Sequence, residues 1–166
     1  MIRGSALVYR ADDVNTDVIW PGKYTYVQIP PEEMPQYAME TFDPEFPQKA
    51  KDHSVLVVGK NFGCGSSREQ ASECLLHSGI KAIVACSFAR IFYRNSINLG
   101  LPVIECPEAV AAISTGDGVH VELAKGVVRV GELEFAFAAY PPFVLDLIED
   151  GGLIEHIRKN RKEPSS

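Results

Sequence analysis

The fold of this 166-residue chain is decided by residues 54–69, which read SVLVVGKNFGCGSSRE. The β-branched run 54–58 followed by Gly59 is typical of a buried strand that ends at a glycine. After a glycine-rich loop, residues 66–78 place apolar side chains at three- and four-residue spacing, and Gly79 is a helix stop signal. The stretch therefore predicts a strand, a loop and an amphipathic helix.

The same alternation continues along the chain. Residues 82–85 and 102–104 read as strands, and residues 88–99 read as a helix that Gly100 ends. Strands that alternate with helices form βαβ units, in which the strands are parallel. Two such crossovers are expected in the middle of the chain.

The flanking segments suggest further strands and helices. Short strands are expected at residues 6–9, 119–123, 127–130 and 133–136, and short helices at 143–149 and 153–159. The expected fold class is α/β, a β/β/α domain with a parallel βαβ core and an additional antiparallel sheet. We expect one domain over residues 1–166, with a short flexible tail at about 161–166. Six prolines between residues 21 and 47 predict a structured excursion there, and long loops in compact domains are usually functional.

Composition excludes several classes of protein. Hydrophobic residues make up 46% and charged residues 23% of the chain, as in ordinary globular domains. The formal net charge of -6 argues against binding to nucleic acid or to anionic membranes. Neither a membrane span nor a signal-peptide apolar region is recognised, so a cytoplasmic protein is expected.

The four cysteines are Cys64, Cys74, Cys86 and Cys106, and no two of them form a C-x-x-C pair. Their spacing predicts neither a zinc site nor an iron–sulfur cluster in this chain. Most are expected to be reduced, small apolar residues.

The glycine-rich loop is the candidate binding site. Ligands of open α/β sheets bind beyond the carboxyl ends of the strands, where a helix start offers unpaired N–H groups to an anion. Ser66 and Ser67 can either cap the helix or present hydroxyls to the ligand. A cation such as Arg68 in the first helical turn is unfavourable, which favours a role in binding a carboxylate. The alternative is that Ser66 caps the helix, Glu69 compensates the dipole and Arg68 points into solvent.

Known nucleotide and hydrolase motifs do not fit this loop. A P-loop requires lysine and then serine or threonine after its last glycine, whereas Gly65 is followed by two serines. A dinucleotide fingerprint would need glycine or alanine at Arg68. Ser66 does not lie in the Gly-x-Ser-x-Gly context of α/β-hydrolases, and the histidines have no motif context.

Four collinear segments resemble one family. Residues 61–69 (NFGCGSSRE) resemble the signature loop of the aconitase swivelling domain and of the small subunits of isopropylmalate isomerase and homoaconitase. Residues 13–19 (DVNTDVI) are similar to the family's Thr-Asp motif, residues 87–98 (SFARIFYRNSIN) to its second helix, and residues 100–102 to the strand entry after it. The resemblance covers about the first two thirds of the chain strongly.

The resemblance implies the dehydration and rehydration of a hydroxy-dicarboxylic or tricarboxylic acid. In such enzymes a 4Fe-4S cluster lies on a separate large subunit, which would be the partner of this chain in a heterodimer or heterotetramer, and no cofactor is expected here. By the same resemblance Ser66 is the catalytic base, Ser67 and Arg68 bind a substrate carboxylate, and Asp17 is a second catalytic residue in the same active site. Thr16 either orients Asp17 or forms a turn.

Substrate choice in the family is thought to lie in the loop after the Thr-Asp motif, here residues 21–27 (PGKYTYV). Homoaconitase-type chains would have arginine at Tyr26. An aromatic residue there suits a branched alkyl group better than a third carboxylate, although Lys23 could still reach an anion. The expected activity is therefore isomerisation of 3-isopropylmalate and 2-isopropylmalate in leucine biosynthesis.

Three alternatives stay open. The substrate could be homoaconitate, methylmalate/citraconate or dimethylmalate, the chain could be a non-catalytic anion-binding module, or it could be a free-standing nucleotide-binding domain. Arg90, Arg94 and Asn98 form a polar stripe at helical spacing. This stripe is either a solvated face, a contact with the large subunit or a support of the signature loop.

Overall fold

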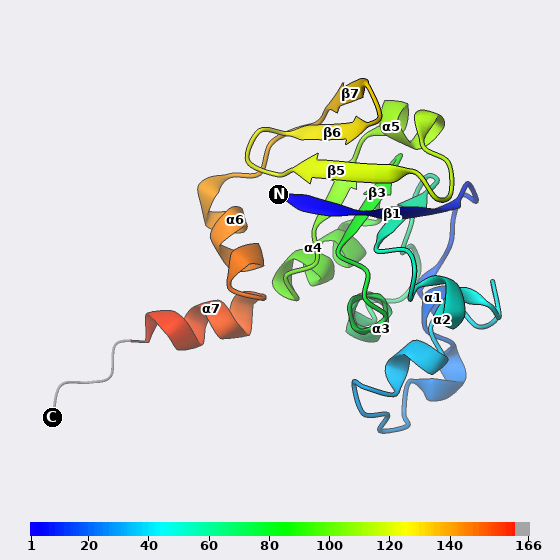
Figure 1. The fold of residues 1–166 in the computed structure, drawn as a ribbon. Coiled ribbons are helices and arrows are strands. Elements are labelled where there is room, and N and C mark those ends of the chain that lie inside the picture. The colour runs from blue at the N-terminus through cyan, green and yellow to red at the C-terminus, as the bar shows by residue number, and fades with distance from the viewer. Residues whose placement is uncertain (162–166) are drawn as a thin grey trace, which may run out of the picture.

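A computed structural model describes residues 1–161, and the predicted tail beyond residue 161 lies outside this range. Its strands form one seven-stranded sheet in the order β4-β3-β2-β1-β5-β6-β7 (Figure 1). The strands are β1 (Ile2–Tyr9), β2 (Val55–Val58), β3 (Ala82–Ala85), β4 (Val103–Glu105), β5 (Gly118–Glu122), β6 (Val127–Val130) and β7 (Leu133–Ala136).

Seven α-helices and two short 3-10 helices connect and cover these strands in the described part of the chain. The α-helices are α1 (Thr16–Ile19), α2 (Phe46–Lys49), α3 (Glu69–His77), α4 (Arg90–Asn98), α5 (Pro107–Ala112), α6 (Pro142–Glu149) and α7 (Leu153–Asn160). The 3-10 helices are η1 (Gly22–Tyr24) and η2 (Met34–Gln36). Within residues 1–161, no helix has the length and apolar character needed to cross a membrane.

Strand β1 belongs to both halves of the sheet. Its second half pairs in parallel with β2, from Ala6 opposite Val55 to Tyr9 opposite Val58. Its first half pairs antiparallel with β5. The strand predicted at residues 6–9 therefore starts four residues earlier than expected. Its first half has no apolar pattern typical of a strand, and only its backbone pairing with β5 defines it.

The sheet alternates its side chains between two cores. Leu56 and Val58 face the side that α3 and α4 cover, whereas Val55 and Val57 face α5. Val119, Val121 and Val128, from the antiparallel strands, share the second core with Val55 and Val57. The antiparallel strands thus lie over the face opposite α3 and α4 (Figure 1). The predicted β/β/α layering and the two βαβ crossovers are confirmed.

Some elements differ from the sequence-based expectation. Helix α3 begins at Glu69 instead of residue 66, and α5 was not predicted at all. The signals for α5 were present, since Pro107 lies in its first turn with the acidic Glu108 beside it. The helix has only six residues, which is too short to show a helical periodicity in the sequence.

The proline-rich excursion is anchored to the sheet by Asp43. Tyr9, at the end of β1, donates a 2.6 Å hydrogen bond to the Asp43 carboxylate, and Lys49 donates another at 2.8 Å. Burial of Asp43 opposes its ionisation, but the bonds from Lys49 and Tyr9 outweigh it and hold the pKa of this carboxyl below its ordinary value. Phe46, which is fully buried, packs against the same tyrosine.

Helices α3 and α4 are joined by a buried hydrogen bond between Ser72 and Ser96, whose Oγ atoms lie 2.9 Å apart. We expect Ser72→Ala to lower the free energy of unfolding by about 1–3 kcal/mol, because it leaves the Ser96 hydroxyl buried without this partner. The double substitution Ser72→Ala/Ser96→Ala should recover most of the loss, since no polar group is then orphaned. Urea unfolding of Ser72→Ala, Ser96→Ala and the double variant measures this, and additive losses in the double variant would contradict it.

Candidate active site

Three loops meet at the carboxyl edge of the parallel strands. Residues 10–15 follow β1, residues 59–68 follow β2 and residues 86–89 follow β3. These three strands are neighbours in the sheet, so the loops after them share one edge. This edge is where α/β folds bind their ligands.

The loop after β2 is fastened to both of its neighbours by backbone hydrogen bonds. On one side Phe62 donates to the Ser87 carbonyl at 3.1 Å, and Ala89 donates back to Phe62 at 3.0 Å. On the other side the Gly63 N–H donates to Val14 at 2.8 Å. The loop therefore continues the pairing of the sheet beyond the strands.

Gly63 and Gly65 both adopt positive φ values, of 79° and 95°. At Gly63 a Cβ atom would lie 2.1 Å from Cγ of Phe92 in α4, so only glycine lets the helix pack this closely. At Gly65 the nearest atoms to a Cβ would be 3.6 Å away, on Asn15 and Thr16. The two glycines shape the loop, and the first also positions α4.

The loop ends in Ser66, Ser67 and Arg68, whose relation to the helix differs from the prediction. Arg68 is the N-cap residue of α3 with an extended backbone, and no side chain caps this helix. Neither serine therefore serves as the cap, and Arg68 does not lie in the first helical turn. Both serines are exposed and Arg68 is partly buried. The hydroxyls are presented at the surface, as the binding hypothesis requires.

Arg68 forms an ion pair with Asp17 through Nη1 and Oδ1. The two residues are 51 positions apart in the sequence, and α1 places Asp17 in its first turn. Gly22 lies beside the pair, since a Cβ there would be 3.4 Å from Arg68 Nη1 and 3.5 Å from Asp17 Oδ1. The structure thus brings Asp17 into contact with Arg68, which directly follows the two serines in the chain.

Thr16 forms two hydrogen bonds to the backbone of the signature loop. Its N–H donates to the Cys64 carbonyl at 2.8 Å, and its Oγ1 donates to the Ser66 carbonyl at 3.0 Å. The side chain is 1% exposed. Asn15, which sequence reasoning did not single out, caps α1 by accepting a 3.0 Å hydrogen bond from Val18. Its signal was present, because asparagine before a short helical segment is a preferred N-cap.

Lys23 and Tyr26 lie on the neighbouring loop in different environments. Lys23 pairs with Glu40 at 2.7 Å and lies 4.9 Å from the centre of the Tyr24 ring. Tyr26 is 98% exposed and borders a hollow of about 350 Å³ that reaches Gln70 of α3. Glu40 was missed by sequence reasoning, because nothing local links it to Lys23.

Two buried polar atoms at this hollow, Trp20 Nε1 and Thr25 Oγ1, have no hydrogen-bond partner in the described part of the chain. Trp20 is 1% exposed, so its N–H is fully removed from solvent. Buried polar groups are nearly always satisfied in proteins, by protein atoms, ligands or ordered water. The hollow therefore has hydrogen-bonding capacity that the chain itself does not use.

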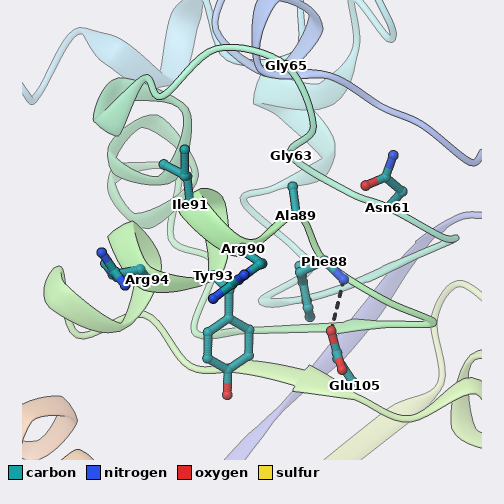
Figure 2. Close-up of a pocket in the computed structure, with 10 residues that line it drawn as sticks. All are labelled: Asn61, Gly63, Gly65, Phe88, Ala89, Arg90, Ile91, Tyr93, Arg94 and Glu105. Carbon is teal, nitrogen blue, oxygen red and sulfur yellow. Dashed lines mark hydrogen bonds between the residues drawn. The ribbon is translucent and has the colours of Figure 1, made fainter.

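On the other side of the signature loop lies an open groove of about 850 Å³, here named the α4 groove. It runs between residues 61–65, Glu105 at the end of β4 and the first turns of α4 (Figure 2). Glu105 accepts a 3.0 Å hydrogen bond from the Phe88 N–H, which fixes the start of the helix segment. Arg90 and Arg94 line the groove and are both exposed.

The cysteines are free thiols, and burial raises the pKa of Cys74, Cys86 and Cys106 above the ordinary value. Cys64 lies on the signature loop and is partly buried. Within residues 1–161, no three His, Cys, Asp or Glu side chains gather as they would around a metal ion. The polar side chains that this edge brings together are the hydroxyls of Ser66 and Ser67, the carboxylate of Asp17 and the guanidinium of Arg68.

A family model described as the aconitase C-terminal domain matches residues 1–109. This range contains the Thr-Asp segment, the signature loop and helix α4. The chain therefore belongs to the aconitase family, and the resemblance of its motifs is confirmed.

Relatives of nearly equal length carry one name. The chain is 49% identical over 162 residues to "3-isopropylmalate dehydratase small subunit 1" of Methanopyrus kandleri, covering 96% of this chain and 94% of the relative. It is 48% identical to the 3-isopropylmalate dehydratase small subunit of Pyrobaculum calidifontis, covering 97% and 99%. A crystal structure of 3-isopropylmalate dehydratase from Methanocaldococcus jannaschii superposes with a TM-score of 0.85 at 39% identity, covering 96% and 95% of the two chains.

The close approach of α4 to Gly63 can be tested by substitution. Gly63→Ala should lower the free energy of unfolding by about 2–5 kcal/mol, because it adds the strain of positive φ to an overlap with the Phe92 ring. Gly116→Ala is the matched control, since Gly116 has a φ of 94° but nothing within 4 Å of a Cβ, and should cost only about 1–2 kcal/mol. Thermal unfolding measures both, and equal losses would show that the contact with Phe92 does not matter.

Proposed function

We propose that this chain is the small subunit of a 3-isopropylmalate dehydratase, a hydro-lyase that acts with a separate large subunit. The observation that carries the proposal is the surface cluster of Ser66, Ser67 and Arg68 on a loop whose backbone is fastened on both sides. Near full-length relatives named as such small subunits support it. The reaction removes water across two adjacent carbons and adds it back in the opposite sense, so that the hydroxyl changes carbon.

Ser66 is assigned as the base that takes the proton from the carbon next to a carboxylate. A serine hydroxyl is a weak base unless the alkoxide is stabilised, and a nearby cation provides such stabilisation. Arg68 follows two residues later, and its N–H donates to the Ser66 carbonyl at 2.9 Å, which keeps the turn tight. The base and the cation are thereby held on one short, shaped segment.

Ser67 and Arg68 are assigned to a carboxylate of the substrate. A guanidinium has five N–H donors, and the ion pair with Asp17 uses only those on Nη1. The remaining donors can bind a carboxylate in the two-pronged geometry that arginine favours. Asp17 then acts as the anchor that keeps the guanidinium oriented toward the substrate.

Thr16 is assigned a positioning role. Its buried hydroxyl bonds the Ser66 carbonyl, so it sets the place of the base without contacting the substrate itself. The adjacent Asp17 is held by the same short helix. The Thr-Asp pair thus orients both the base and the cation.

The loop with Tyr26 is assigned to the alkyl group of the substrate. Its hollow is bordered by Tyr26, Val27, Ile29 and Met34, which offer apolar surface to a branched chain, while the Trp20 N–H and Thr25 hydroxyl at the same hollow, unpaired within residues 1–161, remain open to a polar group of the substrate. The charge of Lys23 is already balanced by Glu40, so a third substrate carboxylate would find no free cation at that residue. An unpaired charge in such surroundings is costly, which favours an alkylmalate over a tricarboxylic acid.

The large subunit is assigned a 4Fe-4S cluster, which would bind the hydroxyl group of the substrate. The four cysteines of this chain do not gather at the site, and only Cys64 lies on its loop. The residues contributed here act on the proton and on the carboxylate. Catalysis therefore requires both chains.

Reconstitution tests the proposal directly. The chain is mixed with the cluster-bearing large chain of the same organism under anaerobic conditions, and turnover of isopropylmalate is followed with and without iron. We expect no turnover by either chain alone, iron-dependent turnover by the mixture, and a kcat/KM at least about 10-fold higher than for homoaconitate, citraconate or dimethylmalate. An assembled complex that turns over none of these acids would leave only the anion-binding alternative.

In the reconstituted enzyme, Ser66→Ala should lower kcat by about 100-fold or more with little change in KM, because the base is lost while carboxylate binding remains. Assembly with the large chain should be little affected, since the substitution removes one hydroxyl and leaves the backbone hydrogen bonds of the loop in place. Ser67→Ala is the comparison, with its main effect expected on KM. A near-normal kcat for the Ser66 variant would remove this serine from the mechanism.

A further inference from the structure

We infer that the α4 groove is a docking surface for an acidic segment of the large subunit, with Arg90 and Arg94 as its charged contacts and Ile91 as its apolar contact. The inference rests on the proposed function, because it takes the partner from there. It concerns a surface that the reaction itself does not explain, and it identifies which face of the chain the partner covers.

The charges of the groove are unbalanced. Arg90 and Arg94 lie one helical turn apart on α4, and neither forms an ion pair within residues 1–161. Glu105 is the acidic residue of the groove, and one of its oxygens accepts the N–H of Phe88. A chain with a formal net charge of -6 thus presents two exposed cations on one wall of an open groove.

The position of Arg90 conflicts with the stability of its own helix. It occupies the first turn of α4, where the helix dipole disfavours a cation, and the N-cap residue Ala89 has no side chain that can cap. The helix start therefore offers open N–H groups and positive charge to an outside acceptor. Residues that break a local rule in this way tend to be found at functional surfaces.

Ile91 adds an apolar contact between the two arginines. Its side chain is 52% exposed and lines the groove together with the ring of Tyr93. Figure 2 shows Arg90, Ile91, Tyr93 and Arg94 following one another along α4, next to the loop that carries Gly63 and Gly65. Arginine and aromatic side chains around an apolar centre are the composition typical of protein interfaces.

The groove is continuous with the proposed active site. Gly63 and Gly65 form part of its wall, and Ser66 follows directly in the chain. Ser66 and Ser67 are exposed in the isolated chain, so a closed site requires another chain to cover this edge. A segment that lies in the groove would place the rest of the large subunit over the two serines.

The test compares two double variants with the same change in net charge. Arg90→Glu/Arg94→Glu reverses both groove cations, whereas Lys51→Glu/Lys81→Glu reverses two exposed lysines near the amino ends of β2 and β3, at the opposite edge of the parallel strands. Binding to the large chain is measured by titration calorimetry over a range of salt concentrations. Substitution by glutamate in the first turn of α4 favours the helix, so thermal unfolding should confirm that the groove variant is folded.

We expect the groove variant to raise the Kd for the large chain by about 10-fold or more and to lose most of the salt dependence of binding. The lysine variant should remain within about twofold of the unaltered chain. At saturating large chain the groove variant should regain a normal kcat, because neither arginine is assigned to the substrate.

Other results would overturn the inference. An unchanged Kd removes the groove from the interface, and an unchanged Kd with a raised KM assigns the arginines to the substrate. A change only in self-association of the isolated chain assigns the groove to a second copy. If the unaltered chains assemble but turn over no alkylmalate, the proposed function is wrong. The docking surface is then still tested, because the Kd of the groove variant is compared with that of the lysine variant and does not depend on turnover.

Discussion

Two hydrogen bonds from Thr16, one from its amide to Cys64 and one from its hydroxyl to Ser66, hold the signature loop in the shape on which the site depends. The loop also turns at Gly65, whose φ of 95° is not helical, and α3 begins only after Arg68. The bonds from Thr16 fix the turn in which the Arg68 N–H donates to the Ser66 carbonyl, and they leave the two serines exposed beside the Arg68–Asp17 ion pair.

The parallel half of the fold was predictable because its signals are local. Strand β2 is buried on both faces, so it reads as an unbroken apolar run, and glycines mark the ends of the elements around it. The antiparallel strands were found from their alternation and their turn glycines. Strand β1 was only half recognised, since its polar first half is defined by partners more than 100 residues away.

The site was predictable to the extent that its residues are adjacent in the sequence. Ser66, Ser67 and Arg68 follow one another, and their exposure could be expected from a loop at the carboxyl edge of the sheet. The start of α3 was not predicted, because its N-cap is Arg68, which does not cap the helix with its side chain, whereas Ser66 and Ser67 are the usual capping residues. Asp17 came from the family resemblance, and its pairing with Arg68 needed the fold. The pairing of Lys23 with Glu40 is a tertiary contact with no local signal.

Strand β1 pairs with both β2 and β5, and this also affects how the chain folds during synthesis on the ribosome. Strand β1 is synthesised first, and its parallel partner β2 follows early in the chain. Its antiparallel partner β5 is complete only after Val121 has been synthesised. Contacts of such sequence separation are slow to form, and an unfilled strand edge invites pairing with other chains. A nascent chain that stalls before β5 is made would therefore carry its parallel strands with an unpaired edge on the first half of β1, and such an edge favours aggregation during synthesis.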